Sequence, residues 1–251
     1  MTSVKKIYFV SDAHLGALWI RDSHEQEQTL VRWLESIRAD ASEIFLMGDM
    51  FDFWFEYKTV VPKGYVRFLG KLAELAEAGI AIHFFAGNHD IWTFGYLEQE
   101  TGLMVHPVPE IIERNGKRFF LAHGDGLGRH PLSVRIIRWI FHNRTCQTLF
   151  SWLPPRLGMR FGFAWSKANR KNHRRRKYAD YLGEDNETLV QFAKSFPENE
   201  KIDYFIFGHR HILLDLVLKN GSRVCILGDW FETFSYGVFD GSDFVLELFD
   251  K

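Results

Sequence analysis

The chain of 251 residues contains only two cysteines, Cys146 and Cys225, and neither belongs to a Cys-x-x-Cys pair. Two isolated thiols cannot build a disulfide framework, so we expect the protein in a reducing compartment. No apolar run approaches the roughly 18 residues that a membrane-spanning helix needs. Residues 1–6 lead directly into a predicted strand, without the apolar core of a signal peptide. These absences predict a cytoplasmic protein.

The chain also has little net charge, −1 at pH 7, because 31 lysines and arginines oppose 32 aspartates and glutamates. A balance near zero gives no overall field that would attract the chain to nucleic acid or membranes. One segment is an exception: residues 129–179 contain no aspartate or glutamate, although arginine and lysine recur throughout. From length and composition we predict one domain, residues 1–251, that carries a basic helical insertion at approximately 129–180.

Short apolar runs alternate with amphipathic segments in the first half of the chain. Strands are predicted at residues 7–10, 44–47, 80–86 and 118–122, and helices at residues 25–39 and 64–78. Strands that alternate with helices in this way favour an α/β domain with a largely parallel sheet.

The second half of the chain changes to closely spaced strands. They are predicted at residues 204–207, 213–218, 224–227, 236–239 and 244–249. The Asn220-Gly221 pair between two of these strands is typical of a hairpin turn. We therefore predict an antiparallel second sheet that packs face to face on the first, between outer layers of helices. The fold class is mixed α/β with α+β character.

The basic insertion is predicted to form two amphipathic helices. In the first helix Leu132, Ile136, Trp139 and Ile140 share one face, and Arg135, Arg138 and His142 share another. Pro154-Pro155 separates the helices, because proline cannot continue a helix interior. The second helix combines an apolar stripe around Phe161 and Trp165 with a basic stripe. We predict a helical lobe that is both aromatic and cationic.

Polar side chains that can bind metal come directly after several predicted strands. They are Asp12, His14, Asp49, Asn88, His123, His209 and His211, with His89 beside Asn88. Each of them taken alone is typical of an ordinary loop. Because ligand sites of open α/β sheets lie at the carboxyl ends of the strands, we expect the whole set to converge on one site.

Aspartate, asparagine and histidine are suitable ligands for a pair of divalent cations. Two such ions about 3.5–4 Å apart clamp a phosphoryl group, and a hydroxide that they activate attacks phosphorus in line. Asp49 is the candidate for the anion that bridges both ions. Oxygen and imidazole ligands without thiolate favour Mn²⁺, iron or Zn²⁺, and we predict Mn²⁺.

Five motifs around these residues resemble the signature of the calcineurin-like metallophosphoesterases. They are Asp12-Ala13-His14, Gly48-Asp49-Met50-Phe51-Asp52, Gly87-Asn88-His89-Asp90, His123-Gly124 and Gly208-His209-Arg210-His211. The fourth motif has histidine before glycine, as in one branch of the family. The resemblance covers most of the chain outside the basic insertion and implies a four-layer α/β/β/α metallophosphoesterase sandwich.

The resemblance also implies roles for individual residues. One metal takes Asp12, His14, Asp49 and His211, and the other takes Asp49, Asn88, His123 and His209. His89 is the implied catalytic residue, which steadies the phosphoryl oxygens or protonates the leaving group. Asn88 and His89 would therefore both contact the substrate.

Within this superfamily, the insertion resembles that of the UDP-2,3-diacylglucosamine pyrophosphohydrolases of lipid A biosynthesis. The residues that carry the likeness are His142-Asn143, Leu149-Phe150, Leu153-Pro154-Pro155-Arg156-Leu157 and Ser166-Lys167-Ala168-Asn169. This branch implies a helical lid and hydrolysis of UDP-2,3-diacylglucosamine to UMP and 2,3-diacylglucosamine 1-phosphate. Basic amphipathic helices also suit an anionic membrane surface. We expect a peripheral position on the inner face of the inner membrane, with no obligate protein partner.

His89 departs from this branch, whose best-known members carry arginine at that position. Histidine is typical of general phosphodiesterases of the superfamily. The alternative is therefore a soluble phosphodiesterase or nucleotide pyrophosphatase, in which the lid serves another substrate. A nuclease or nucleic-acid binder is a third interpretation, suggested by Arg174-Arg175-Arg176-Lys177. The interleaved apolar face and the acidic remainder of the chain oppose that third interpretation.

Contacts between the insertion and a substrate are only loosely indicated by the sequence. Lys167, Arg170 and Arg174 lie on the basic stripe and are candidate partners of a phosphate or of the uridine side. A solvated basic face explains the same pattern equally well, so both interpretations stay open here.

Overall fold

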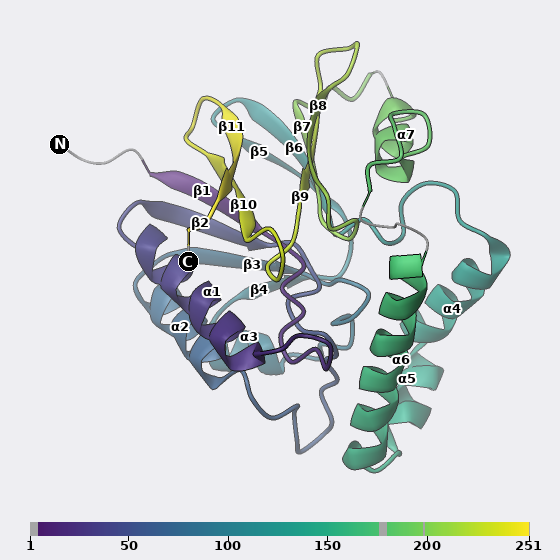
Figure 1. Ribbon diagram of the computed structural model, residues 1–251. Helices are drawn as coiled ribbons and strands as arrows, with labels where there is room; N and C mark the ends of the chain where they lie inside the picture. The colour runs from purple at the N-terminus through teal and green to yellow at the C-terminus, as the bar shows by residue number, and fades with distance from the viewer. Residues whose placement is uncertain (1–4, 176–179, 198, 251) are drawn as a thin grey trace.

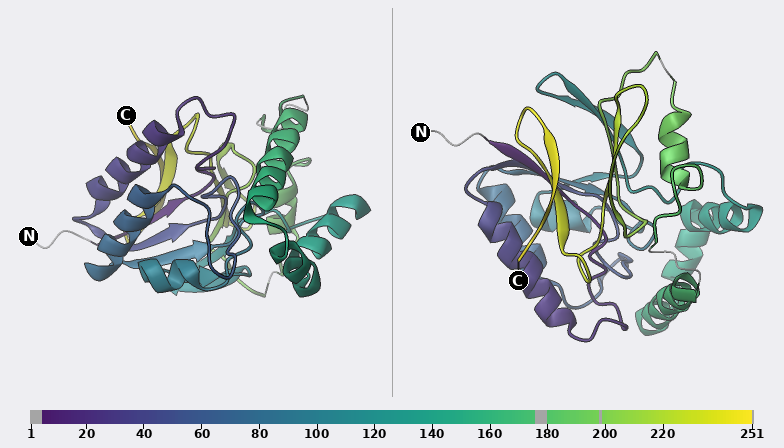
Figure 2. Two further views of the ribbon diagram at one scale, coloured as in Figure 1. Left: turned by 90° about the horizontal axis from the view of Figure 1, so that it is seen from below. Right: turned by 45° about the horizontal axis from the view of Figure 1, so that its top comes forward.

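The computed structural model describes residues 5–175, 180–197 and 199–250, and they contain two β-sheets that pack face to face (Figure 1). The first sheet has the strand order β11-β10-β1-β2-β3-β4, and the second has the order β5-β6-β7-β9-β8. Helices cover the outer faces of the sheets, and a further group of helices stands beside them (Figures 1 and 2).

Four strands of the first sheet run parallel to one another. They are β1 (Lys6–Val10), β2 (Ala41–Leu46), β3 (Ala81–Phe85) and β4 (Met104–His106). Strands β10 (Ser235–Phe239) and β11 (Phe244–Leu248) extend the sheet in antiparallel fashion, and Ile7 of β1 lies opposite Phe239 of β10.

The second sheet has a parallel centre and antiparallel edges. Its strands are β5 (Glu110–Arg114), β6 (Lys117–Ala122), β7 (Tyr204–Phe207), β8 (Leu213–Val217) and β9 (Arg223–Leu227). Strands β6, β7 and β9 are parallel, whereas β5 and β8 pair with them antiparallel. The turn at Asn220-Gly221 joins β8 to β9, so the predicted hairpin is confirmed.

The prediction that the second half of the chain builds an antiparallel sheet of its own is wrong. Hydrogen bonds between β10 and the free edge of β1 place the β10–β11 hairpin in the first sheet. Strand β9, in turn, pairs with β7 in parallel. Strand spacing reveals a hairpin, but it does not say which sheet edge receives that hairpin.

The helices complete a four-layer arrangement. Helices α1 (Ser23–Ile37), α2 (Val66–Glu77) and α3 (Tyr96–Thr101) cover the first sheet, and α7 (Thr188–Lys194) covers the second. Between the sheets, the ring centroid of Phe9 lies 5.0 Å from that of Phe45 and 6.1 Å from that of Phe119. Burial of each such ring stabilises the fold by about 1.5–3 kcal/mol. The mixed α/β/β/α architecture is therefore confirmed.

Helices α4 (Leu132–His142), α5 (Arg144–Ser151) and α6 (Pro155–Arg175) form what we call the helical lobe. The sequence predicted two helices here, but Asn143 divides the first of them. Its side chain caps α5 by accepting a hydrogen bond from the backbone N–H of Cys146 at 3.1 Å. Within the described residues, no helix combines the length and the apolar character needed to span a membrane.

An aromatic cluster attaches the helical lobe to the loops that follow β2 and β3. Phe53, Phe55 and Trp92 are buried at its centre, and the lobe residues Phe141 and Phe150 pack against them. Trp92 Nε1 also donates a hydrogen bond to the carbonyl oxygen of Phe141 at 2.8 Å. The lobe is thus held against the loops that carry the predicted site residues.

Candidate metal centre

The parallel strands of both sheets bring the predicted ligands to one site. Asp12 and His14 follow β1, Asp49 follows β2, Asn88 and His89 follow β3, His123 follows β6, and His209 and His211 follow β7. Three overlapping groups have ligand atoms within 4.8 Å of one another. The groups are Asp12–His14–His211, His14–Asp49–His89 and Asp49–His123–His209. The expected convergence is therefore present.

The first group has close contacts between different ligand types. His211 Nε2 lies 3.1 Å from Asp12 Oδ1 and 3.3 Å from His14 Nε2. His14 Nε2 lies 3.8 Å from the same oxygen of Asp12. Ligands bound about 2.0–2.2 Å from one metal ion lie roughly 3 Å or slightly more from one another. The separations of these three side chains are therefore compatible with one shared cation.

Asp49 stands between the two halves of the cluster. Its Oδ2 lies 3.2 Å from His123 Nε2 and 3.7 Å from His14 Nε2. Its Oδ1 accepts a hydrogen bond from the backbone N–H of His89 at 2.8 Å. One carboxylate therefore faces a histidine from each sheet, as a bridging ligand must, and the bridging role itself stays a prediction.

The outer nitrogens of two imidazoles are occupied by partners outside the cluster. His14 Nδ1 lies 3.3 Å from Asp52 Oδ1, and His123 Nδ1 donates a hydrogen bond to the carbonyl oxygen of Met47 at 2.8 Å. With Nδ1 occupied, Nε2 of each ring is the atom that faces the cluster. Metal-binding histidines generally use their second nitrogen in this way, because the outer hydrogen bond sets the tautomer and the ring orientation.

Three buried polar atoms at the centre make no well-aligned hydrogen bond with the described residues, although two of them lie within 3.2 Å of another candidate ligand. They are Asp12 Oδ1, Asn88 Oδ1 and His123 Nε2. A buried polar atom without a well-aligned partner is costly, and a cation bound among these three would remove that cost. Carboxylate oxygen, amide oxygen and imidazole nitrogen are all ligands of divalent cations. The residues therefore fit a divalent metal site.

The backbone of the cluster is strained. Among the described residues, five of the eight non-glycine residues with a left-handed φ are candidate ligands, with φ between 47° and 65°. They are Asp12, His14, Asp49, His209 and His211. Such a conformation costs roughly 1–2 kcal/mol for a residue with a side chain. Packing elsewhere in the fold must therefore hold these loops in place.

The charges of the cluster depend on one another. Burial alone would lower the pKa of His14, but its contacts with the carboxylates of Asp12 and Asp52 and the charge of Asp49 raise that pKa to about 10. Burial also opposes ionisation of Asp49, yet His123 and the other nearby histidines hold its pKa well below the usual range. Without a metal, protons on imidazoles thus compensate the carboxylates. Binding of a divalent cation would replace and release those protons.

Two glycines allow the ligand loops to approach one another. At Gly48, whose φ is 90°, a Cβ atom would lie 2.6 Å from His123 Nδ1. At Gly208, a Cβ atom would collide with the side chains of Ser11 and Asp12. Any side chain at either position would therefore push the ligand loops apart.

Asp90 received no role from the sequence, but it organises two of the loops. Its buried carboxylate accepts hydrogen bonds from the backbone N–H groups of Met50 at 2.7 Å, Gly87 at 2.8 Å and Asp49 at 3.2 Å. Burial and the charge of Asp49 raise the pKa of Asp90 to about 6, although the backbone donors act in the opposite direction. The spacing of the Gly-Asn-His-Asp motif carries no signal for these contacts.

Asp52 connects the cluster to the helical lobe. Ser166 of α6 is buried, and its Oγ donates a hydrogen bond to Asp52 Oδ1 at 2.7 Å. The same carboxylate oxygen lies beside His14 Nδ1, and the carbonyl oxygen of Asp52 accepts a hydrogen bond from His89 Nδ1 at 2.7 Å. Asp52 thus contacts the lobe, a candidate ligand and the predicted catalytic histidine.

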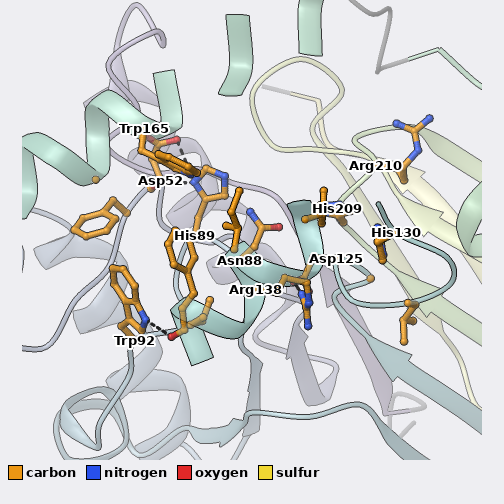
Figure 3. A pocket seen from close by; sticks show the side chains of 18 of the residues that line it. Asp52, Asn88, His89, Trp92, Asp125, His130, Arg138, Trp165, His209 and Arg210 are labelled. Atoms are coloured by element: carbon orange, nitrogen blue, oxygen red, sulfur yellow. Dashed lines mark hydrogen bonds and ion pairs between the residues drawn. The ribbon is translucent and has the colours of Figure 1, made fainter. Parts of the chain in front are cut away.

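A pocket of about 460 Å³ lies between the cluster and the helical lobe (Figure 3). One part of its wall is apolar and includes Phe53, Trp92, Phe141, Phe161 and Trp165. Another part is polar and includes Asn88, His89, Asp125, His130, Arg138 and His209. Arg138 of α4 forms an ion pair with Asp125, and burial lowers the pKa of its guanidinium. The pocket joins the ligands to an amphipathic surface.

Of the three basic residues predicted to contact substrate, Lys167 alone has a described side chain. It is exposed and does not belong to the described residues that line the pocket. Arg170 and Arg174 lie in the last turns of α6, and their side chains fall outside the described residues. Arg138 does line the pocket, although the sequence indicated only that it lies on the basic face of its helix.

Comparison with known proteins decides the family. Residues 5–213 match the family model of the calcineurin-like phosphoesterases. The chain is also 45% identical to the UDP-2,3-diacylglucosamine hydrolase of Porphyromonas gingivalis, over 96% of this chain and 97% of that protein. This chain belongs to the calcineurin-like phosphoesterase family. The resemblance of its five motifs is thereby confirmed.

More distant relatives of this phosphoesterase carry the same description. The UDP-2,3-diacylglucosamine hydrolase of Haemophilus ducreyi is 26% identical over 89% of this chain and 91% of that protein. The one of Neisseria meningitidis serogroup A is 27% identical over 90% of each chain. The enzyme is therefore a member of a metal-dependent phosphoesterase family, and its cluster provides suitable ligands for divalent cations.

Proposed function

We propose that this phosphoesterase hydrolyses the diphosphate of UDP-2,3-diacylglucosamine, giving UMP and 2,3-diacylglucosamine 1-phosphate. The observation that carries the proposal is the pocket that joins the ligand cluster to the aromatic side of the helical lobe. A diphosphate that also bears acyl chains needs both surfaces at once. The 45% identity with the Porphyromonas gingivalis protein supports the same substrate.

In this proposal two divalent cations occupy the cluster. Asp12, His14 and His211 would hold one ion, Asn88, His123 and His209 would hold the other, and Asp49 would be shared. The bound ions would supply Lewis acidity toward the phosphoryl oxygens and the attacking water. Mn²⁺ suits a ligand set of carboxylates, an amide and imidazoles that contains no thiolate.

His89 is proposed to act on the oxygens of the transferred group. Its Nδ1 contacts the carbonyl oxygen of Asp52 at 2.7 Å, and a carbonyl only accepts hydrogen bonds. The Nδ1 atom therefore carries the proton of the neutral ring. Nε2 is then the atom available to a substrate in the pocket, which His89 lines (Figure 3). A protonated Nε2 can stabilise a phosphoryl oxygen or give its proton to a leaving oxygen.

A second candidate function, hydrolysis of a water-soluble phosphodiester, is favoured by His89 itself. An alkoxide leaving group is a strong base and needs a proton donor, which an imidazolium provides. The phosphate monoester released from a diphosphate is a weaker base and depends less on protonation. In the lipid reaction, His89 would therefore contribute mainly by stabilising charge.

We further propose that the helical lobe contacts an anionic membrane surface at the cytoplasmic face. Trp139 of α4 and Trp152, directly after α5, are 63% and 75% exposed, and Arg135, Arg144 and Arg156 are exposed on the three helices of the lobe. Amphipathic helices with aromatic and basic residues bind at membrane interfaces without crossing them. Sedimentation with vesicles that contain phosphatidylglycerol should exceed sedimentation with neutral vesicles. Equal binding to both would contradict the electrostatic part of this proposal.

The proposed reaction is tested with purified protein, Mn²⁺ and UDP-2,3-diacylglucosamine. We expect UMP and the lipid monophosphate in equal amounts by mass spectrometry, and no product after chelation of the metal. A parallel assay uses bis(p-nitrophenyl) phosphate as a water-soluble diester. Cleavage of that diester without release of UMP from the lipid would refute the first function and support the second.

A further inference from the structure

A buried ion pair supports the Gly208-His209-Arg210-His211 loop, and its Arg210, which also lines the pocket, has no role in the chemistry proposed above. Arg210 Nε donates a hydrogen bond to Glu187 Oε1 at 2.5 Å, and Arg210 Nη2 donates one to Glu187 Oε2 at 3.0 Å. The side chain of Glu187 is completely buried and that of Arg210 is 5% exposed. Desolvation of two charges offsets most of their attraction, so apolar residues would serve stability equally well.

The two neighbours of Arg210 belong to opposite halves of the cluster. His209 groups with Asp49, whereas His211 groups with Asp12. Both histidines have left-handed backbone conformations, with φ values of 65° and 53°. Arg210 therefore lies between one candidate ligand of each metal ion, and a shift of its backbone would displace both.

The guanidinium of Arg210 joins two further segments to this loop. Glu187 is the residue that directly precedes α7. Arg210 Nη2 also donates a hydrogen bond to the carbonyl oxygen of Asp180, in the connection between α6 and α7, at 3.2 Å. A guanidinium presents its donors in a rigid planar fork, so two-point pairing fixes orientation as well as distance. The pair thus holds the ligand loop against α7 and this connection.

We propose that Arg210, held by Glu187, is a positioning residue that sets the separation of His209 and His211 and thereby the affinity of both metal sites. The proposal rests on the proposed function only in requiring that the cluster binds divalent cations. Without the anchor, the strained backbones of both histidines could relax and move their rings away from Asp12 and Asp49. Outer residues that orient metal ligands typically change affinity by about 10–100-fold when they are replaced.

The main test removes both charges together, as Glu187→Leu with Arg210→Met in the full chain. Apolar replacement of a buried ion pair is often neutral for folding, so the thermal midpoint should stay near that of the wild type. Calorimetric titration with Mn²⁺, without substrate, should show binding weakened by about 10–100-fold. The electron paramagnetic resonance signal of the spin-coupled Mn²⁺ pair should also decrease. Unchanged Mn²⁺ affinity in a folded double variant would overturn the proposal.

Arg210→Lys is the second variant, because lysine keeps the charge but lacks the fork. It should fold and bind Mn²⁺ more weakly than the wild type. If the double variant does not fold, this variant decides, and wild-type Mn²⁺ affinity in Arg210→Lys would then overturn the positioning role.

The matched control is the pair of Arg114 and Glu43, which is also bidentate, with N–O distances of 2.7 and 2.8 Å. It joins β5 to β2 outside the ligand loops, so Glu43→Leu with Arg114→Met should leave Mn²⁺ affinity unchanged. An error in the proposed substrate can be distinguished from an error in the positioning role. Wild-type protein that binds two Mn²⁺ ions but releases no UMP would refute the substrate and leave the positioning role intact.

Discussion

The metal centre and the helical lobe differ in how firmly the fold constrains their side chains. Asp12, Asp49 and His123 are buried, and hydrogen bonds to neighbouring loops fix the orientation of their side chains. In the lobe, by contrast, no side chain of α4 or α5 is buried, although both helices are described completely. Hydrolysis requires a fixed arrangement of charges, whereas acyl chains require only an apolar surface. We infer that chemistry and substrate choice reside in separate parts of the chain.

Besides the aromatic cluster, three polar contacts among the described residues connect these two regions. They are the hydrogen bond from Ser166 to Asp52, the ion pair of Arg138 with Asp125, and the hydrogen bond from Trp92 to Phe141. If the separation is correct, substitutions in the centre should abolish all reactions, and substitutions in the lobe should affect the lipid substrate alone.

The largest effect is expected from Asp49→Ala. The variant should have no measurable turnover and should lose metal from both sites, because this carboxylate faces histidines from both sheets. Metal content after dialysis and release of UMP are the measurements. Asp215→Ala, which removes a carboxylate paired with Arg223 on the second sheet, is the control. An Asp49→Ala protein with two metals and near-normal turnover would place the bridge elsewhere.

His89→Ala should lower turnover by about 10²–10⁴-fold with metal content unchanged, as is typical for loss of a general acid or base. Loss of a metal ion would instead make His89 a ligand, which its grouping with His14 and Asp49 permits. His89→Arg separates the two proposed roles. It should retain more activity toward the diphosphate lipid than toward an alkyl diester such as glycerophosphocholine, because arginine stabilises charge but does not donate the proton that an alkoxide needs.

Phe161→Ser should raise the KM for the lipid substrate about tenfold and leave diester turnover unchanged. An acyl chain that covers this half-exposed ring would gain about 1.4 kcal/mol, and serine removes that gain. Leu157→Ser is a matched control on the same helix: both side chains are 51% exposed, but only Phe161 lines the pocket. Equal effects of both variants would show that the pocket has no special role in substrate binding.

The smallest effect is expected from Ser166→Ala, which removes the hydrogen bond between α6 and Asp52. The change should cost about 0.5–1.5 kcal/mol of unfolding free energy. For a chain of this size, the thermal midpoint should fall by about 2–5 °C. Ser151→Ala, at an exposed serine whose Oγ donates a hydrogen bond to Thr148 of its own helix, should shift the midpoint less. If Ser166→Ala lowered turnover more than Phe161→Ser does, the lobe would control the chemistry.

The ligand cluster could be predicted residue by residue because each ligand directly follows a short apolar strand. Asp12, Asp49 and His123 stand two, three and one positions after β1, β2 and β6. A strand end is a local feature of the sequence, and ligand sites form where parallel strands end. Local pattern was therefore sufficient to predict which residues converge.

Residues that act through contacts between distant segments could not be predicted in this way. Ser166 reaches Asp52 across 114 positions, and Arg210 reaches Glu187 across 23. In the sequence Ser166 is one polar residue among basic ones, and Arg210 is the variable position of its motif. The sequence likewise did not indicate that β10 pairs with β1. A hairpin forms from local sequence, whereas its place in a sheet depends on which strand edges are available.

The pairing of β1 with β10 has a consequence for synthesis of the chain on the ribosome. Among the described strands β1 emerges first, but the edge that does not pair with β2 pairs with β10, and the last candidate ligand, His211, follows β7. Most of the chain must therefore leave the ribosome before either the first sheet or the metal centre can be completed. Long-range strand pairing folds slowly, and an unpaired strand edge promotes aggregation. We expect the nascent chain to expose this strand edge until the β10–β11 hairpin has been added.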